Sequence, residues 1–538
     1  MADSNTTREV ENRAPQNGPA GQDGIARIVE RNGERLELHD WYGPDDPDNP
    51  FNFKKSYKWI LTITVCFVSI LTGLPAGSYG AGNDYMESKF HIQNQPFPNL
   101  YWATCTWNIG ASVLPLLFVP LTEHSGRMPG YFIAYFVFEV FLFGSAFANN
   151  FATLVVTRFF GGGGSSVAIL LVSGSIADVW QTDGERSLPM SLFGFTSVIG
   201  IALGPFIGSA IVQIKRNDPW RWIFYVQIIY NAGFIPIFWF ILRETRGDAV
   251  LTRRAKKLRK ENPGRRIYAQ AELDRTGVWE LIKISFKRPV RMLFTEPVVL
   301  FFSLWLAFAW GILYLYFSSI VQTFSTSYGF GIMSTGLIQL AISVGGLIGL
   351  LFNPIQDWIY LHSGRWNKAN PGVPKPEARL YTSIIGSSLF TGGLFWYGWT
   401  CRREVHWMVP TAAIACTGVG IFSIFLTVTN YLTDSYERYA ASAISAAGLA
   451  RNGFAAFLPF ASFRLFDTLG FGWAGSLLGF VGLALTFVPV VLVWKGPQIR
   501  ARSPFMAEST WGRDKEARAG LGHGEMEGGS SARVPSQG

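Results

Sequence analysis

The sequence predicts an all-α membrane protein with twelve transmembrane helices in two pseudo-symmetric six-helix bundles. Hydrophobic residues make up 49% of the 538 residues and charged residues only 15%, against roughly 25% charged in an average soluble domain. Apolar segments of about twenty residues recur, and a helix of that length crosses a hydrocarbon core of roughly 30 Å. A long basic stretch separates six such segments from six more, which indicates a parallel internal repeat.

The twelve spans can be placed in chain order. They cover residues 58–77, 100–119, 131–148, 152–176, 188–212, 223–242, 298–320, 334–355, 380–400, 408–430, 440–463 and 471–494. The chain then divides into a disordered N-terminal tail (1–56), a first six-helix bundle (57–243), a basic central loop (244–296), a second six-helix bundle (297–495) and a disordered C-terminal tail (496–538). We expect disorder in both tails because they are polar and rich in Gly, Pro, Asn, Asp or Ser.

The basic residues predict the orientation of the chain. With twelve spans, both tails and the central loop lie on one side, which carries 37 of the 46 Lys and Arg residues. The positive-inside rule then places both termini in the cytoplasm. The polar start of the chain indicates neither a cleavable signal nor a transit peptide, which favours the plasma membrane. We interpret the central loop as an anchor on the anionic leaflet, with a partner-binding site as the alternative.

Neither a metal site nor an enzyme active site is predicted. The four cysteines and six histidines are scattered without metal-ligand spacing, and no nucleotide-binding motif occurs. The formal charge of +9 does not indicate a nucleic-acid partner, because the basic residues lie between the spans. We therefore expect no cofactor and no catalytic residues.

The loop after the second span carries the most specific motif. It reads Pro-Leu-Thr-Glu-His-Ser-Gly-Arg over residues 120–127, so Glu123, Gly126 and Arg127 are the marked positions. This resembles the Gly-x-x-x-Asp-Arg-x-Gly-Arg loop of the major facilitator superfamily, with Val119 and His124 replacing the first Gly and the first Arg. It resembles more closely the version in fungal twelve-span drug:proton antiporters of the multidrug/polyamine type. A carboxylate and a guanidinium there can form a cytoplasmic latch between helix ends; a plain positive-inside turn is the alternative.

The fifth span contains Gly200, Gly204, Pro205 and Gly208. Glycines four residues apart let two helices touch backbone to backbone, and a proline bends a helix. The pattern resembles the antiporter motif of drug-exporting members of the same superfamily. It therefore predicts a pivot, and it favours an exporter over an importer.

Two charged residues near mid-depth are candidates for proton coupling. Arg158 in the fourth span resembles the arginine of the family motif there, and the resemblance implies a coupling role. Glu139 in the third span lies about as far from the outer turn as Arg158, so the two can reach the same depth. We predict a possible ion pair that titrates as a unit, with a protonated, structural Glu139 as the alternative. The glycines of residues 161–164 are interpreted as helix packing, not as a phosphate loop.

A third buried charge and several aromatic residues suggest a substrate cavity. Arg451 lies midway along the eleventh span and must face protein or a wet cavity, where it can bind an anion or the carbonyls of a neighbouring helix. Trp107, Asn108, Trp310 and Tyr314 are deep in the second and seventh spans, where they can contact a flat or amphipathic substrate. Plain helix packing explains each ring equally well.

The resemblance covers about residues 45–505 and implies a secondary active transporter of the major facilitator fold. We predict a proton-coupled exporter of small organic compounds, such as drugs, polyamines or secondary metabolites. An organic-acid transporter, an uncoupled facilitator and a non-transporting nutrient sensor are the alternatives. The expected partners are a small-molecule substrate, protons and the lipid bilayer, and we expect a monomer. In the second half Asp357 is followed only distantly by Arg365, so no latch is assigned there.

Overall fold

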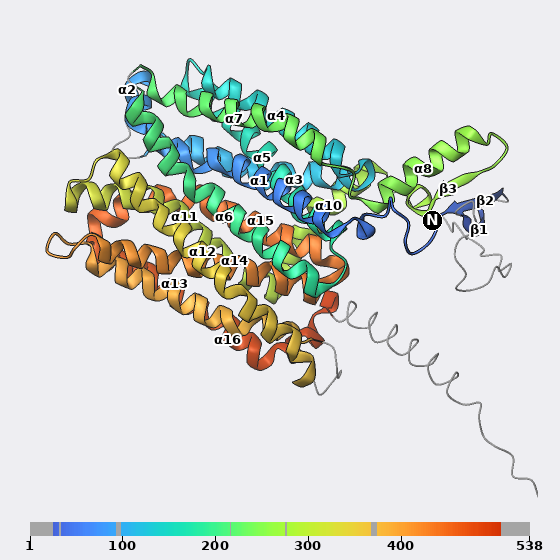
Figure 1. Ribbon diagram of the computed structural model, residues 1–538. Helices are drawn as coiled ribbons and strands as arrows, with labels where there is room; N and C mark the ends of the chain where they lie inside the picture. Colours follow the sequence, from blue (N-terminus) through green and yellow to red (C-terminus); the bar gives the residue numbers. More distant parts are fainter. Residues whose placement is uncertain are drawn as a thin grey trace, which may run out of the picture.

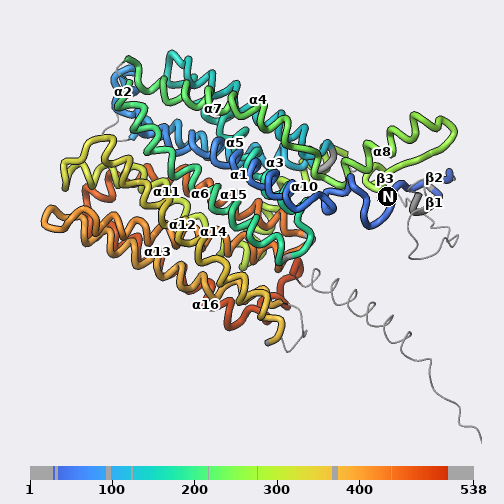
Figure 2. Tube along the Cα trace, viewed as in Figure 1, coloured from blue at the N-terminus to red at the C-terminus, as the bar shows by residue number. Residues whose placement is uncertain are grey.

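The computed structural model describes residues 25–31, 34–92, 98–215, 217–274, 277–366 and 374–506. Two bundles of long, roughly parallel helices lie side by side (Figures 1 and 2). The first bundle consists of α1 (Lys55–Ser78), α3 (Tyr101–Ser125), α4 (Arg127–Ala146), α5 (Phe151–Val179), α6 (Asp183–Ile214) and α7 (Pro219–Ile241), with the short α2 (Asn83–Phe90) after α1. The second consists of α11 (Pro297–Tyr328), α12 (Ile332–His362), α13 (Tyr381–Thr400), α14 (Met408–Tyr436), α15 (Ala440–Phe457) and α16 (Ser462–Arg502).

These helices agree with the predicted membrane class. Within the described residues, 10 segments are long and apolar enough to cross a membrane, and one of them, Ala440–Arg502, contains both α15 and α16. The predicted ninth span corresponds to α13, which is not among the 10. Gly, Ser, Thr and Tyr residues dilute the apolar content of α13, which packs against α14 and α16. The structure is thus consistent with twelve spans.

Local sequence signals set several helix boundaries. The side chain of Asn150 caps α5 by accepting a hydrogen bond from the Thr153 amide at 2.8 Å, and Thr182 caps α6 in the same way. Gly126 separates α3 from α4 at φ 96°, a backbone conformation that L-residues rarely adopt. The turn at Gly126 therefore depends on glycine.

Contacts between the two bundles come mainly from α3 against α15 and α6 against α12. The Asn452 side chain donates to the Ala111 carbonyl at 3.0 Å, which joins α15 to α3. The Asn353 side chain donates to the Ser191 hydroxyl at 2.6 Å, which joins α12 to α6. Among the described residues, few side-chain hydrogen bonds join the two bundles. A cavity can therefore lie between them.

The predicted disorder of residues 1–56 is wrong for the part that the structure describes. Strands β1 (Ile25–Arg31) and β2 (Glu34–His39) pair antiparallel, and β2 pairs in parallel with β3 (Ile267–Ala269) of the central segment. Composition alone missed this small sheet, whose inward side chains Val29, Leu36 and Leu38 are buried. Residues 1–24 lie outside the described residues.

The central segment is largely helical and carries the docked N-terminal strands. It contains α8 (Gly247–Glu261), α9 (Gln270–Leu273) and α10 (Val278–Thr295), and α8 projects from the end of the bundles (Figure 1). The Arg254 guanidinium on α8 binds both carboxylate oxygens of Asp46 at 2.6 and 2.8 Å. We call the end of the bundles that carries this segment the loop side.

The predicted disorder of residues 496–538 is also wrong at its start. Helix α16 continues to Arg502, and Met506 is fully buried. The Ser503 hydroxyl donates to the buried Glu296 carboxylate at 2.6 Å, which holds this segment against the start of α11. Residues 507–538 lie outside the described residues.

Candidate functional site

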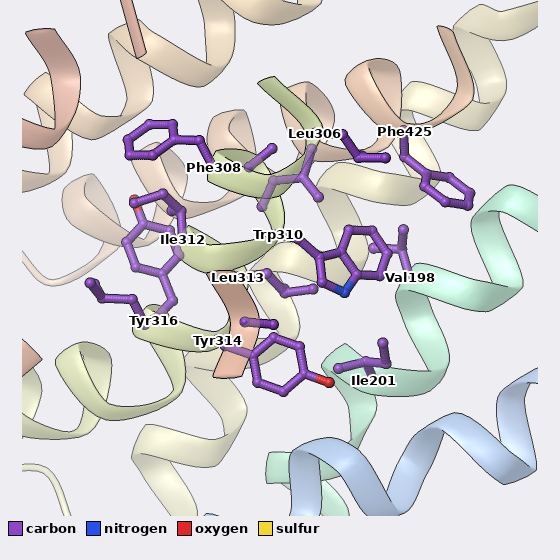
Figure 3. Packing of buried hydrophobic residues seen from close by; sticks show 14 of the residues in the cluster. Val198, Ile201, Leu306, Phe308, Trp310, Ile312, Leu313, Tyr314, Tyr316 and Phe425 are labelled. Atoms are coloured by element: carbon purple, nitrogen blue, oxygen red, sulfur yellow. The ribbon is translucent and has the colours of Figure 1, made fainter. Parts of the chain in front are cut away.

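A cavity of about 400 Å³ lies between the two bundles and extends to the loop side. Its lining includes all five residues that the sequence predicts for a substrate cavity, namely Trp107, Asn108, Trp310, Tyr314 and Arg451. Figure 3 shows Trp310 and Tyr314 on one side of α11, with the Tyr314 hydroxyl directed toward Ile201 of α6. The structure therefore brings residues from α3, α11 and α15 to one space.

Arg451 is the cation at mid-depth in this cavity. Its guanidinium lies 4.8 Å from the centroid of the Trp310 ring and 5.8 Å from that of Phe425. Its Nε donates to the Asn452 side chain at 3.3 Å. Its two terminal amino groups have no hydrogen-bond or ion-pair partner within the described part of the chain. They remain available to a group that enters the cavity.

Arg158 is buried behind the cavity wall and is not one of the lining residues. Its Nη1 donates to the Pro75 carbonyl at 2.8 Å, and its Nε donates to the Ala103 carbonyl at 3.4 Å. The guanidinium lies 4.3 Å from the Trp107 ring centroid and 4.8 Å from that of Tyr79. Carbonyl groups and aromatic faces, which carry only partial negative charge, thus surround Arg158.

The predicted ion pair between Glu139 and Arg158 is wrong for this structure. Both carboxylate oxygens of Glu139 are buried, and neither has a hydrogen-bond partner in the described residues. Glu139 lies on α4 one turn after Tyr135, whose hydroxyl donates to the Asn231 side chain of α7 at 2.8 Å. Arg158 turns instead toward α1 and α3. Equal depth did not bring the two groups together, because the helices direct them to different neighbours.

The glycines of the predicted pivot lie against α1. A Cβ atom at Gly204 would be 2.6 Å from the Leu74 carbonyl oxygen and from the Ser78 amide, and one at Gly208 would be 2.7 Å from the Ser78 carbonyl. Pro205 occupies the same seam, since a Cβ at Gly77 would be 2.9 Å from its ring. The glycine spacing thus lets α6 contact α1 through the backbone.

The glycine run of residues 161–164 also serves close packing. A Cβ at Gly164 would lie 2.9 Å from the Phe138 amide of α4. A Cβ at Gly162 would collide with the Trp107 carbonyl of α3. The run lets α5 sit tightly between α3 and α4, and holds Trp107 at the cavity wall.

Arg127 and Gly126 of the predicted latch lie where helix ends of the first bundle meet. The Arg127 Nε donates to the Asp178 carboxylate at 2.9 Å, which ties the start of α4 to the end of α5. Glu244, just after α7, accepts from the Arg127 amide at 2.7 Å and lies where a Cβ at Gly126 would be. The side chain of Glu123 lies outside the described residues. Sequence reasoning missed Asp178 and Glu244 as partners of Arg127.

An equivalent network closes the loop side of the second bundle. Arg379, just before α13, donates to Asp434 near the end of α14 at 3.1 Å and to Asp357 of α12 at 3.2 Å. Arg379 therefore takes the place that Arg127 has in the first bundle. The loop spacing of the first half does not predict Arg379, because in the second half it leads only to Arg365. Asp357 and Asp434, which lie near the loop-side ends of α12 and α14, were the sequence signal that could have indicated an arginine such as Arg379.

A second cavity, of about 520 Å³, lies between the bundles on the side opposite the central segment. Asp84 and Glu87 are its charged lining residues. Tyr314 and Ala76 line both this cavity and the first one. Tyr314 is only 2% exposed, so its ring is part of the partition between the two spaces.

Two bundles around a central cavity, with arginine clamps at the same end of each, define a membrane transporter of the two-bundle class. The sequence profile of the Major Facilitator Superfamily matches residues 65–459. The chain is 34% identical over 466 residues to the MFS transporter cpaT of Aspergillus oryzae, covering 86% of this chain and 92% of that protein. It is 30% identical over 472 residues to the efflux pump radE of Floropilus chiversii, covering 87% and 86%.

Solved structures agree on the fold. The proton:xylose symporter XylE superimposes with a TM-score of 0.58 at 18% identity, covering 82% of this chain and 96% of that chain. A partially occluded, inward-open form of XylE gives a TM-score of 0.55 at 17% identity. The chain belongs to the major facilitator superfamily, whose members are transporters and not enzymes.

Proposed function

We propose that the chain is a proton-coupled exporter of small organic compounds that works by alternating access. The cavity between the bundles supports this most directly, because both halves supply its wall and Tyr314 separates it from a second cavity on the other side. Rocking of the bundles would expose one space and close the other. The name of the efflux pump radE, which is 30% identical, favours the export direction.

The proposal places the central segment and both termini in the cytoplasm and the chain, as a monomer, in the plasma membrane. The substrates would be drugs, polyamines or secondary metabolites. Uptake into inside-out vesicles, with a compound panel and an imposed pH gradient, is the test. We expect uptake when the lumen is acidic and its loss when an ionophore collapses the gradient. Equal uptake with and without the gradient would refute proton coupling and indicate an uncoupled facilitator.

Glu139 is the group to which we assign proton binding. An unpaired carboxylate in apolar surroundings is costly, so the protonated form is favoured while the site stays closed to water. Glu139 does not line the cavity, but its neighbour Phe138 contacts the Trp107 ring at a centroid distance of 6.4 Å. A change of charge at Glu139 could therefore reach the cavity wall through α4.

The Glu139→Gln variant tests this assignment. It removes the titratable group at nearly constant volume, so we expect transport that no longer responds to the pH gradient. Glu185→Gln, at an exposed position at the start of α6, is the matched control and should leave the response intact. An unchanged pH response in Glu139→Gln would exclude Glu139 as the coupling group.

A further inference from the structure

The mid-depth region of the cavity carries positive charge that no described acid neutralises. Arg451 lines the space, and its two terminal amino groups have no partner among the described residues. Arg158 lies behind the wall, where its guanidinium contacts a backbone carbonyl and aromatic rings. Among the described lining residues, Asp434 is the acidic one, and it is already bonded to Arg379 at the loop-side end. An isolated buried cation is unfavourable, so an anion at this depth is stabilised.

The walls next to Arg451 are flat and aromatic. The Trp310 ring lies 5.4 Å from the Phe425 ring, at an angle of 35°, and Figure 3 shows both beside the aliphatic side chains of α6. Trp107 lines the same cavity from α3. Rings of this kind bury a planar hydrophobic body, and stacking geometry favours aromatic partners. The site therefore combines a charged end with an aromatic slot.

The two cavities also differ in the sign of their charge. In the described lining of the loop-side cavity, Arg127 and Arg379 are ion-paired with nearby aspartates, whereas Arg186 and Arg451 have no ion-pair partner among the described residues. The described lining of the opposite cavity contains Asp84 and Glu87 and no Lys or Arg. Charged clefts concentrate ligands of the opposite sign. An anion is thus attracted to the loop-side cavity and repelled from the other.

We propose that the cavity binds planar organic anions, such as aromatic carboxylates or phenolates, with the anionic group on Arg451 and the ring system against Trp310. This inference rests on the proposed function only in taking the cavity as the transport site. It narrows the substrate class: polyamines and other cations would meet Arg451 without an opposing carboxylate.

A ligand series of constant shape tests the charge preference. Naphthalene-2-carboxylate, naphthalene-2-carboxamide and naphthalen-2-ylmethylammonium share one ring system and differ in charge. Binding to the purified protein in neutral detergent can be followed by titration calorimetry, with empty micelles as the blank. We expect the dissociation constant of the carboxylate to be lower than that of the amide by a factor of about ten or more. The ammonium should bind most weakly. Equal binding of carboxylate and amide would overturn the inference.

Variants assign the preference to Arg451. Arg451→Gln should lose the tenfold preference for the carboxylate while keeping the affinity for the amide. Arg451→Lys should retain part of the preference, because the charge remains while the planar contact with Trp310 is lost. Arg464→Gln, at an exposed position on α16, is the control and should bind like the unchanged protein. A preference that survives in Arg451→Gln would also overturn the inference.

The experiment separates this inference from the proposed function. Equilibrium binding in detergent requires neither a proton gradient nor a direction of transport. Anion-selective binding together with gradient-independent uptake would refute the proposed proton coupling and support the proposed anion site. Gradient-driven uptake of cations, with no anion preference in binding, would refute the proposed anion site and support the proposed proton-coupled transporter. If Arg451→Gln does not fold, the ligand series on the unchanged protein still decides the charge preference.

Discussion

Replacement of Asp46 by Asn should release the N-terminal strands from the central segment. Asp46 is buried, and two hydrogen bonds from the Arg254 guanidinium hold its pKa at about 2, below the ordinary value of 3.8. That lowering corresponds to about 2 kcal/mol of docking free energy at neutral pH. Loss of 2 kcal/mol raises the undocked population about thirtyfold.

Hydrogen exchange in the detergent-solubilised protein measures this population. The amide of Glu37 donates to the Arg266 carbonyl at 2.9 Å, so its exchange requires the strands to separate. We expect exchange there to accelerate about thirtyfold in Asp46→Asn. Asp45→Asn makes the same charge change at an exposed position and is the control. Unchanged exchange in Asp46→Asn would show that the ion pair does not hold the strands.

The same pair predicts a pH dependence. Because the folded pKa of Asp46 lies below its unfolded value, its stabilisation is present in full above about pH 4. It is lost as the pH falls from about 4 to about 2, where the docked carboxylate takes up a proton. Exchange corrected for intrinsic rates should therefore be constant from pH 8 to pH 5 and rise below that window. A rise between pH 8 and pH 6 would point to a different group.

Two further predictions concern the helix seams and the loop-side clamp. Gly204→Ala places a Cβ 2.6 Å from backbone atoms of α1 and should lower the thermal stability and transport, whereas Gly233→Ala, with open space around it, should be neutral. Asp178→Asn removes the 2.9 Å ion pair between Asp178 and Arg127, both largely buried, and should cost about 3 kcal/mol in thermal unfolding. Asp248→Asn, at a half-exposed ion pair, should cost less than about 1 kcal/mol.

The helices were predictable because lipid constrains the sequence strongly. A span needs about twenty apolar residues, so length and composition locate it without knowledge of its neighbours. The cavity residues were predictable for a related reason: Arg451 cannot face lipid, and deep Trp and Asn residues are costly there unless they have partners. Depth in the span and polarity were therefore enough to predict a shared cavity for five residues, namely Trp107, Asn108, Trp310, Tyr314 and Arg451.

The ion pairs were not predictable in the same way, because they depend on helix rotation. The offset from a turn gives the depth of Glu139 and Arg158, but not the direction in which each side chain points. Arg158 turns toward the Pro75 carbonyl of α1, and Glu139 lies where α4 packs on α7. Likewise the spacing around Arg365 does not indicate the second ion-pair network, whose arginine is Arg379, just before α13.

The N-terminal strands were missed for a different reason. The overall content of Asn, Asp, Gly and Pro predicts disorder in the tail, but this average hides a short periodic segment. Residues 25–31 and 34–39 flank an Asn-Gly dipeptide, which is a strong hairpin signal. The parallel contact with β3 is more than 200 residues away in sequence, and local patterns do not indicate it.

Both halves have an arginine ion-pair network at the loop side, but the surroundings of Gly204 in the first half and Gly311 in the second differ. Helix α6 meets α1 through backbone contacts at Gly204, whereas Gly311 of α11 faces a side chain: a Cβ there would lie 2.8 Å from the side chain of Leu458, the residue after α15. Backbone contacts cannot adapt, but side chains can repack at lower cost. A small displacement at Gly311 can therefore be absorbed by repacking of Leu458, whereas one at Gly204 cannot.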